Sequence, residues 1–467
     1  MQRLFSLVWI LTLLCALAMP APPAESQPFV ESYSFLDGSR AGAHGAYDTS
    51  RDRWVMASIR EVPGGSLWGA HLDLTIKNPN QVARTYSFSS AFLGLKQAEF
   101  EIVDVIYDGE GYAIFINKYS PGLGDHWASW IVHVDADLLY VDWAKQIQVS
   151  GDPGAYLRVR DAESLRGGYA IVAALGDAYP YPPAPPVTVV ARLDGAASVL
   201  WSRTYELPRE VAWVEVSYGP EGLVVGGWIS ELQADDPQGL VLMRLETHTG
   251  ALLTAAQYEG VVALDDVAMA QSVGSSNTTG GLYVAGRSAD NDVTFFPVDS
   301  SLLAGTATRM ATGSGLRPIE FVFNPSGDLV AVMQSYFPGD LVLTVPAPLT
   351  GGTGTPVLSD LSPMVPADGV EVLSADRAGD PVMLVGYQEG HSSASTDPVT
   401  LIFTDTAGYL DSCVPAYAVP TRESLPMVTH YFQEWSQTNR SIVTVDYPVN
   451  FQGINYVFGD PLCFGAS

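Results

Sequence analysis

The sequence is organised as a repeated unit of four short, strand-like runs that turn residues separate. The clearest unit covers residues 156–205, with runs at 156–159, 167–174, 187–194 and 198–205. Gly, Pro and Asp lie between these runs, as expected of turns between β-strands. A unit of this size cannot hide its apolar side chains alone, so the repeats are expected to stack on one another.

The following units keep the same order of runs. Arg192-Leu193-Asp194 and Arg244-Leu245-Glu246 occupy the same place in two successive units. Less regular copies extend the series in both directions. The first runs begin near residues 43, 101, 155, 212, 265, 318 and 369, which is a period of roughly 54 residues.

Four short strands in each unit, without helical periodicity in the mature chain, are typical of a propeller blade. The repeats predict an all-β fold, a seven-bladed β-propeller of four-stranded antiparallel blades over residues 27–412. The seventh unit lacks a fourth strand, and residues 29–35 form a spare one before the first unit. We predict that this N-terminal strand pairs with the last blade and closes the ring, which removes two exposed edges. An independent N-terminal hairpin is the alternative.

Residues 1–26 have the features of a secretory signal peptide. Arg3 is followed by an apolar run from Leu4 to Met19, and small residues then offer two cleavage sites. The run is short for a membrane span and no second one follows, so we expect no integral membrane segment after its removal. The predicted location is secreted, periplasmic or cell-surface.

Two cysteines, Cys413 and Cys463, are left after signal removal. In an oxidising compartment they are expected to form one disulfide, with two free buried thiols as the alternative. They bracket most of a β-rich C-terminal extension, residues 413–467, with further strand-like runs at 427–435, 441–447 and 454–458. This extension either forms a small appendage pinned by the disulfide or replaces the missing outer strand.

The chain is strongly acidic, with 51 Asp and Glu against 23 Lys and Arg and a formal net charge of −28. Such a surface repels phosphate backbones, which argues against nucleic acid and anionic membranes as partners. It favours cations or basic partners, or it is an adaptation for solubility or salt without any partner. We expect a monomer.

The repeats resemble those of secreted bacterial β-propeller repeat proteins. In that group a Gly-Gly pair opens a hydrophobic run, a second run ends in Leu-Asp, and a Trp follows a turn. The matching residues here are Gly167-Gly168 to Ala174, Arg192-Leu193-Asp194 and Ser198 to Trp201, and the match is good over about residues 155–305. Cys413 soon after the last unit is also similar to that group. The resemblance implies an exported scaffold, often of unassigned function, and brings no catalytic residues.

Motifs for catalysis or cofactor binding are missing from the sequence. The seven His residues show no metal-ligand spacing, and there is neither a Gly-x-Ser-x-Gly nor a P-loop nor an Asp-x-Asp-x-Asp-Gly calcium loop. We therefore expect no catalytic residues, no cofactor and no dedicated metal site, with calcium as a possible loop ligand.

The loops that join second to third strands are expected to share one face of the propeller. They carry the candidate binding residues Asp125, His126, Asp177, Tyr179, Tyr181, Glu231, Asp235, Asp236, Asp290, Asp292, Asp340 and Glu389. Tyrosines there can stack on sugar rings, and grouped carboxylates can chelate calcium. The alternative is that solvated loops of an acidic protein are simply acidic.

The leading interpretation is a non-catalytic scaffold that binds a protein, glycan or cation through this face. The alternative is a glycan-active hydrolase or lyase whose carboxylates or His converge on the channel mouth. A structural cell-surface repeat without a small ligand is the third possibility, and fold alone does not choose between these classes.

Overall fold

The structure is a computed structural model, and it describes the chain in segments. The described residues are 29–33, 40–48, 50–61, 70–78, 84–89, 99–120, 126–137, 140–151, 157–176, 187–207, 211–219, 222–229, 239–259, 268–271, 282–288, 292–311, 316–323, 329–335, 341–345, 355–360, 369–373, 383–387, 399–403, 416–418, 421–440, 442–447, 450–456 and 459–464. Within these segments the chain forms strands, turns and bends and no helix.

The strands of the described segments group into seven five-stranded antiparallel sheets, numbered here in the order of their inner strands along the chain. Sheet 1 contains β2 (Arg40–Asp48), β3 (Arg53–Glu61), β4 (Ala70–Lys77), β5 (Arg84–Ser89) and β34 (Asn450–Tyr456), and sheet 2 contains β6 (Glu99–Tyr107), β7 (Gly111–Ser120), β8 (His126–Asp135), β9 (Val141–Val149) and β33 (Ile442–Asp446). Sheet 3 contains β10 (Leu157–Leu165), β11 (Gly168–Leu175), β12 (Val187–Asp194), β13 (Val199–Glu206) and β32 (Ser436–Asn439), and sheet 4 contains β14 (Val211–Gly219), β15 (Gly222–Ile229), β16 (Leu240–Leu245), β17 (Leu252–Glu259) and β31 (Val428–Tyr431). Sheet 5 contains β18 (Ala268–Gln271), β19 (Leu282–Arg287), β20 (Val293–Val298), β21 (Ala307–Ala311) and β30 (Thr421–Leu425). Sheet 6 contains β22 (Leu316–Phe323), β23 (Leu329–Ser335), β24 (Leu341–Val345), β25 (Val357–Asp360) and β29 (Ala416–Ala418). Sheet 7 contains β26 (Gly369–Leu373), β27 (Met383–Tyr387), β28 (Val399–Phe403), β1 (Phe29–Tyr33) and β35 (Gly459–Phe464).

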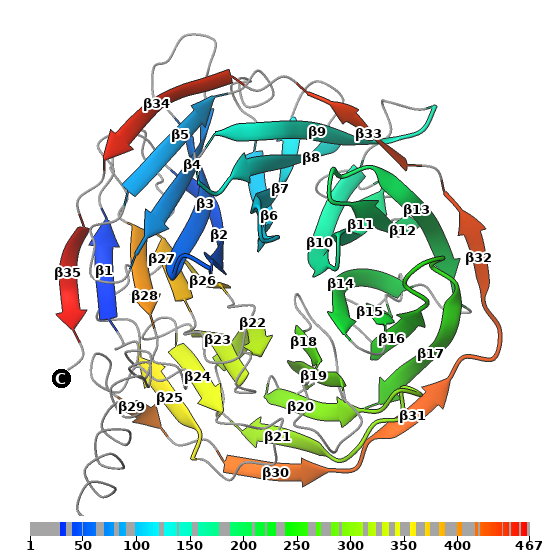
Figure 1. Cartoon of the computed structure of the whole chain (residues 1–467). Helices are drawn as coiled ribbons and strands as arrows, with labels where there is room; N and C mark the ends of the chain where they lie inside the picture. The colour runs from blue at the N-terminus through cyan, green and yellow to red at the C-terminus, as the bar shows by residue number, and fades with distance from the viewer. Residues whose placement is uncertain are drawn as a thin grey trace, which may run out of the picture.

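The sheets stand around a central opening, as Figure 1 shows. The first strand of each sheet lies nearest the opening, and β6, for example, lies beside β2 on one side and β10 on the other. The inner strand of the last sheet, β26, lies beside both β22 and β2. The fold is therefore all-β and propeller-like.

The N-terminal strand β1 belongs to the last sheet. It pairs antiparallel with β28, with Phe29 opposite Phe403 and Tyr33 opposite Val399. Its other edge pairs with β35, the last strand of the chain. Strands from both ends of the chain are thus held side by side in one sheet.

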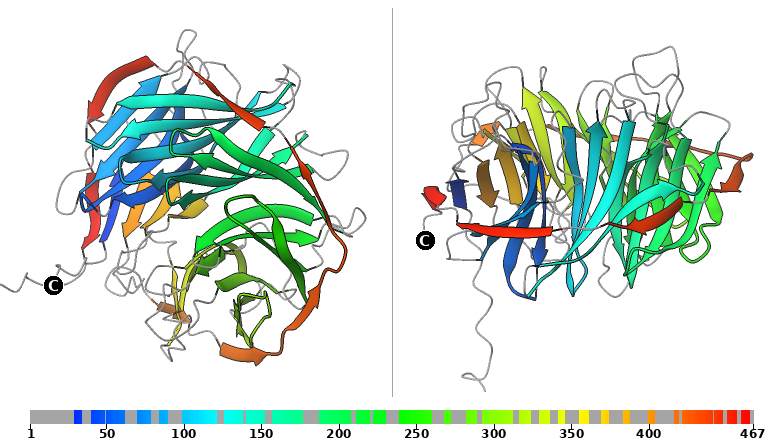
Figure 2. Two further views of the ribbon diagram at one scale, coloured as in Figure 1. Left: turned by 45° about the vertical axis from the view of Figure 1, so that its right-hand side comes forward. Right: turned by 90° about the horizontal axis from the view of Figure 1, so that it is seen from above.

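The C-terminal segment takes neither of the two forms expected from the sequence. Its strands β29 to β35 form the outer strand of every sheet, and they visit sheets 6, 5, 4, 3, 2, 1 and 7 in that order. We call residues 416–464 the belt, and Figure 2 shows it running along the outside of the ring. Cys413 lies outside the described residues, as does the side chain of Cys463, so the expected disulfide remains a prediction.

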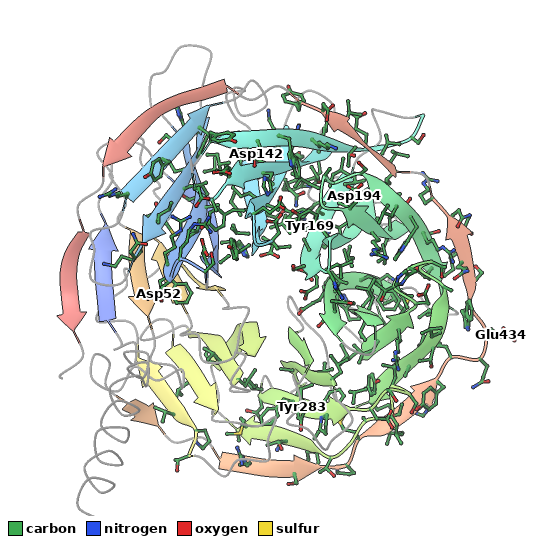
Figure 3. The ribbon with its side chains drawn as sticks, viewed as in Figure 1. Asp52, Asp142, Tyr169, Asp194, Tyr283 and Glu434 are labelled. Carbon is green, nitrogen blue, oxygen red and sulfur yellow. The ribbon has the colours of Figure 1, made fainter. Side chains whose placement is uncertain are left out.

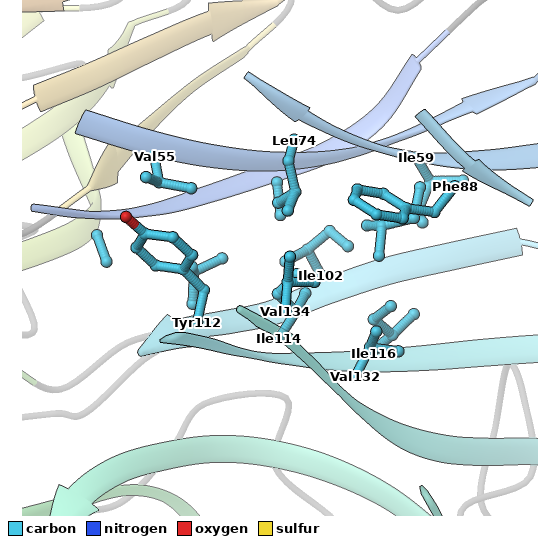
Figure 4. Close-up of a cluster of buried hydrophobic side chains, with 14 of the residues drawn as sticks. Val55, Ile59, Leu74, Phe88, Ile102, Tyr112, Ile114, Ile116, Val132 and Val134 are labelled. Carbon is cyan, nitrogen blue, oxygen red and sulfur yellow. The ribbon is translucent and has the colours of Figure 1, made fainter. Parts of the chain in front are cut away.

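The apolar core lies between neighbouring sheets. In the gap between sheets 1 and 2, Val55 and Leu74 pack against Ile114 and Val132, and all four side chains are buried (Figure 4). Equivalent clusters fill the next gaps along the ring. Each sheet therefore depends on its neighbours for the burial of its apolar faces.

The belt closes several of these gaps from outside, with a side chain at the point where it passes from one sheet to the next. Tyr447 packs into the gap between sheets 1 and 2, Ile442 into the gap between sheets 2 and 3, and Phe432 into the gap between sheets 3 and 4. Leu425 and Met427 pack against the cluster of sheets 4 and 5. The belt thus adds apolar contacts as well as backbone hydrogen bonds.

Ile442→Ala should show how much the belt stabilises the ring. Ile442 is 3% exposed, whereas its neighbour Val443 is 37% exposed. Loss of the buried side chain should lower the free energy of unfolding by about 2–4 kcal/mol, and Val443→Ala should cost less than about 1 kcal/mol. Urea unfolding of both variants checks this, and equal effects would show that the belt is not packed as described.

Candidate functional site

The predicted binding face lies mostly outside the described residues. We call it the loop face, the end of the sheets where second and third strands are joined. Of its candidate residues, the structure describes Asp292 in full and, for His126, only its place as the first residue of β8. The other candidates lie outside the described residues: Asp125, Asp177, Tyr179, Tyr181, Glu231, Asp235, Asp236, Asp290, Asp340 and Glu389.

Asp292 is a structural residue at the base of its loop. Its side chain is largely buried, and one carboxylate oxygen lies 3.7 Å from Nε of Arg309. Its backbone NH donates to Oγ of Ser288 at 3.2 Å, and its carbonyl accepts from the backbone NH of Ser288 at 2.9 Å. These contacts close the connection between β19 and β20, and the binding role of Asp292 stays a prediction.

A polar cluster lies at the loop face, where sheets 2 and 3 meet. Arg158 of β10 donates two hydrogen bonds to Glu101 of β6, at 3.0 and 2.8 Å, and its guanidinium stacks over Trp127 with 4.3 Å to the ring centre. Asn117 donates to Glu101 at 2.8 Å and to the carbonyl of Val159 at 2.7 Å. The cluster fastens sheet 2 to sheet 3 at the loop face.

The charges of this cluster are set by burial and pairing. Burial opposes ionisation of Glu101, but the hydrogen bonds and charge of Arg158 outweigh it and lower the pKa of Glu101. The nearby Lys118 is 4% exposed, and burial lowers its pKa to about 8. Its amine lies over the Phe100 ring, 5.6 Å from the centre. The arrangement holds charges in place at this end of sheets 2 and 3.

The opposite end of the sheets, here called the turn face, joins first to second and third to fourth strands. Its turns in successive sheets are capped by a carboxylate at the last position of the hydrophobic run. Asp194 accepts from the backbone NH groups of Ala196 and Ser198. Asp299 accepts from Ser301 and Leu303 in the same way. The Leu-Asp motif of the repeat therefore builds a turn.

The Arg and Trp of the same motif reach across to the next sheet. The Arg192 guanidinium and Nε1 of Trp201 both donate to the carbonyl of Thr247, and Tyr205 donates to the carbonyl of Gly250. A Cβ on Gly250 would lie 2.7 Å from the Trp201 ring, so this position requires glycine.

The contact repeats one step along the ring. Arg244 donates to the carbonyl of Ser300, and Tyr258 donates to the carbonyl of Leu302. The repeat motif thus joins one sheet to the next, and we call this contact an intersheet latch. The recurring Arg-Leu-acidic triplet is its signature in the sequence.

A second latch joins the turns between first and second strands. The Tyr112 hydroxyl of sheet 2 donates to Asp48 of sheet 1 at 2.6 Å, and Tyr169 of sheet 3 donates to Asp108 of sheet 2 at 2.6 Å. Sequence reasoning missed this pair, although a Tyr just after the turn glycine was visible in both units. Between sheets 3 and 4 the equivalent residues are Leu165 and Leu223, so the acidic residue and the Tyr are lost together.

His133 extends the second of these latches. Its Nδ1 lies 2.9 Å from Asp142 and its Nε2 lies 3.2 Å from Asp108, while its ring stacks on Trp143. Figure 3 labels Asp142 on sheet 2 and Tyr169 on sheet 3, on either side of this cluster. Burial disfavours the imidazolium, but Asp108 and Asp142 outweigh it and raise the pKa of His133. Hydrogen bonds from His133, Tyr169 and two backbone NH groups overcome the burial of Asp108 and lower its pKa.

This cluster is suited to holding sheets together rather than to catalysis. Both ring nitrogens of His133 are occupied by carboxylates, and its side chain is 6% exposed. A general base needs a free nitrogen within reach of a substrate. Within the described segments, no group of three or more His, Cys, Asp or Glu residues could hold a metal ion. The same segments contain no helix long and apolar enough to cross a membrane.

Tyr169→Phe should weaken the union of sheets 2 and 3. It removes the hydroxyl that donates to the charged Asp108, and loss of such a bond costs about 1.5–3 kcal/mol of unfolding free energy. Tyr218→Phe is the control, because Tyr218 is 37% exposed and its hydroxyl can bind water. Chemical denaturation of both proteins checks the difference, and a neutral Tyr169→Phe would show that the latch stabilises nothing.

The His133 cluster should make stability fall at alkaline pH. Because the folded-state pKa of His133 lies above its ordinary value of about 6.5, its contribution is complete below that pH and is lost as the pH rises through the folded-state pKa. The loss should reach about 1.4 kcal/mol for each unit of pKa difference. Urea unfolding between pH 6 and 9 should show a steeper fall for the wild type than for His133→Gln. Parallel curves for the two proteins would refute the assignment.

Comparisons with known proteins do not assign the chain to a family. No family model matches it, and no curated protein matches it. Among solved structures it is similar to a Synechocystis apocarotenoid oxygenase mutant, with 15% identity, 62% of this chain covered and a TM-score of 0.32. It is also similar to the soluble aldose sugar dehydrogenase of Escherichia coli, with 12% identity, 65% of this chain and 96% of that chain covered, and a TM-score of 0.30. The chain spans 63% of the length of the oxygenase that it matches.

Proposed function

We propose that this protein is an exported, non-catalytic β-propeller scaffold that binds a protein, glycan or cation through its loop face. The observation that carries this proposal is the difference between the two ends of the sheets. At the turn face, Asp108, Asp194 and Glu246 cap turns of sheets 2, 3 and 4, and Tyr112, Tyr169 and Trp201 latch sheets 1 to 4 together. Side chains engaged in this way are not available to a partner.

The connections at the loop face differ in length and composition. Residues 176–186 join β11 to β12 and residues 388–398 join β27 to β28, whereas residues 166–167 suffice for the turn between β10 and β11. Long loops on a rigid scaffold are where binding residues are usually found. This supports the loop face, with its acidic and tyrosine residues, as the recognition surface.

The scaffold itself we propose to be a closed ring of seven blades. The inner strands lie beside one another from β2 round to β26 and back to β2, and β1 supplies the strand that the last unit lacks. We further propose that residues 1–26 direct export and that Cys413 and Cys463 form a disulfide. In that arrangement the disulfide would fasten the beginning of the belt to its end.

Paired substitutions on the loop face test the function. Asp235→Asn with Asp236→Asn should reduce the calcium-induced rise in melting temperature, since a bound ligand stabilises the folded state by mass action. Tyr179→Ala with Tyr181→Ala should weaken binding to oligosaccharides on a glycan array. Asp446→Asn, whose carboxylate is 92% exposed on the outer rim, is the matched control. The loop-face proposal fails if neither paired variant differs from the control with any ligand that the wild type binds.

A further inference from the structure

The belt carries two exposed aromatic side chains where it passes from sheet 4 to sheet 3. Tyr431, at the end of β31, is 40% exposed, and Trp435, just before β32, is 42% exposed. Phe432 between them packs into the gap between the two sheets. The inward aromatic residue therefore fixes the passage, and the two outward ones are left in contact with water.

The passage is anchored on both sides, so the two aromatic residues are displayed on a fixed backbone. On the β31 side, the Phe432 NH donates to the carbonyl of Ala255 at 3.1 Å, and Nε2 of His430 lies 2.7 Å from Glu259. On the β32 side, Gln437 accepts from the Leu252 NH at 3.1 Å. A surface held in this way loses little conformational entropy when it binds a ligand.

The same stretch is neutral in a strongly acidic protein. Residues 428–445 contain one acidic residue, Glu434, and one basic residue, Arg440, whereas the whole chain carries a net charge of −28. Two carboxylates of neighbouring strands lie beside them, Glu206 at 3.0 Å from Ser436 and Glu259 at 2.7 Å from His430. Amide and hydroxyl side chains fill much of the remainder, and Gln433, Ser436, Thr438 and Asn439 are all exposed. Figure 3 labels Glu434 at the outer rim, away from the central opening.

We propose that this passage is a binding site for neutral polysaccharide, distinct from the loop face. Sugar rings present C–H faces that stack on exposed aromatic rings, and their hydroxyl groups hydrogen-bond to amides and hydroxyls. An uncharged ligand fits this surface, because Glu206, Glu259 and the net charge of the whole protein repel anionic polymers. It fits a second copy of the chain poorly, since two molecules of this charge repel one another.

Affinity electrophoresis tests the site. The folded protein is run through native gels that contain a soluble β-glucan, mannan, xylan or dextran, with alginate as the anionic polymer. At least one neutral polymer should retard the wild type, and alginate should not. Trp435→Ala and Tyr431→Ala should weaken the retardation at least about tenfold together, while Trp435→Phe should retain most of it. Tyr218→Ala, at an exposed tyrosine elsewhere, is the matched control, and unchanged melting temperatures show that the variants fold.

Several results would overturn the proposal. These are the absence of retardation in every neutral gel, retardation that survives in Trp435→Ala with Tyr431→Ala, and a wild-type dimer in sedimentation velocity that these substitutions dissociate. Retardation abolished by Tyr179→Ala with Tyr181→Ala, but not by the belt variants, would assign the glycan to the loop face instead. That last result would leave the proposed function intact and remove only this inference.

Discussion

The structure depends on burial between sheets, because no sheet can cover its own apolar faces. All eight residues of β11 are buried, which means that both faces of that strand need a neighbour. The side chains at the gaps come from two sheets at once, as with Ile114 of sheet 2 against Leu74 of sheet 1. Stability is therefore a property of the assembled ring, and the hydrogen-bonded latches and the belt act on a core that only the ring can form.

Polar residues in this fold are used chiefly to hold one sheet against the next in the chain. Asp48 binds Tyr112, Asp108 binds Tyr169, and the motif residues Arg192 and Trp201 bind the turn of sheet 4. Near the opening, a bulge in β10 precedes Asp161, which accepts from the Val216 NH of the next sheet at 2.6 Å. Buried polar groups that are paired in this way add direction to an otherwise non-directional apolar contact.

The sequence predicted the all-β units well because alternating apolar runs and turn residues are local signals. The strands over residues 157–206 follow the runs of that unit within a few positions. The belt could not be predicted in this way: its strands are as short as Ala416–Ala418 and Ser436–Asn439, and their partners lie far away in the chain. The candidate site was harder to predict, because contacts such as that of Asp292 with Arg309 depend on strand pairing and are not local in the sequence; the Asp292 carboxylate lies 3.7 Å from Arg309 of the neighbouring strand β21.

Residues that recur between the units and residues that do not recur have different roles in this fold. Residues that recur between units, such as Arg192 and Arg244 or Asp194 and Glu246, are engaged in turns and latches. This supports the proposal that a partner is recognised by residues outside the repeat. Two kinds remain, the unequal loops of the loop face and the belt, where Trp435 has no counterpart in the repeated units. A series of similar sheets gains an individual surface only from segments that break its symmetry, and the belt does this while it adds the outer strand to each sheet.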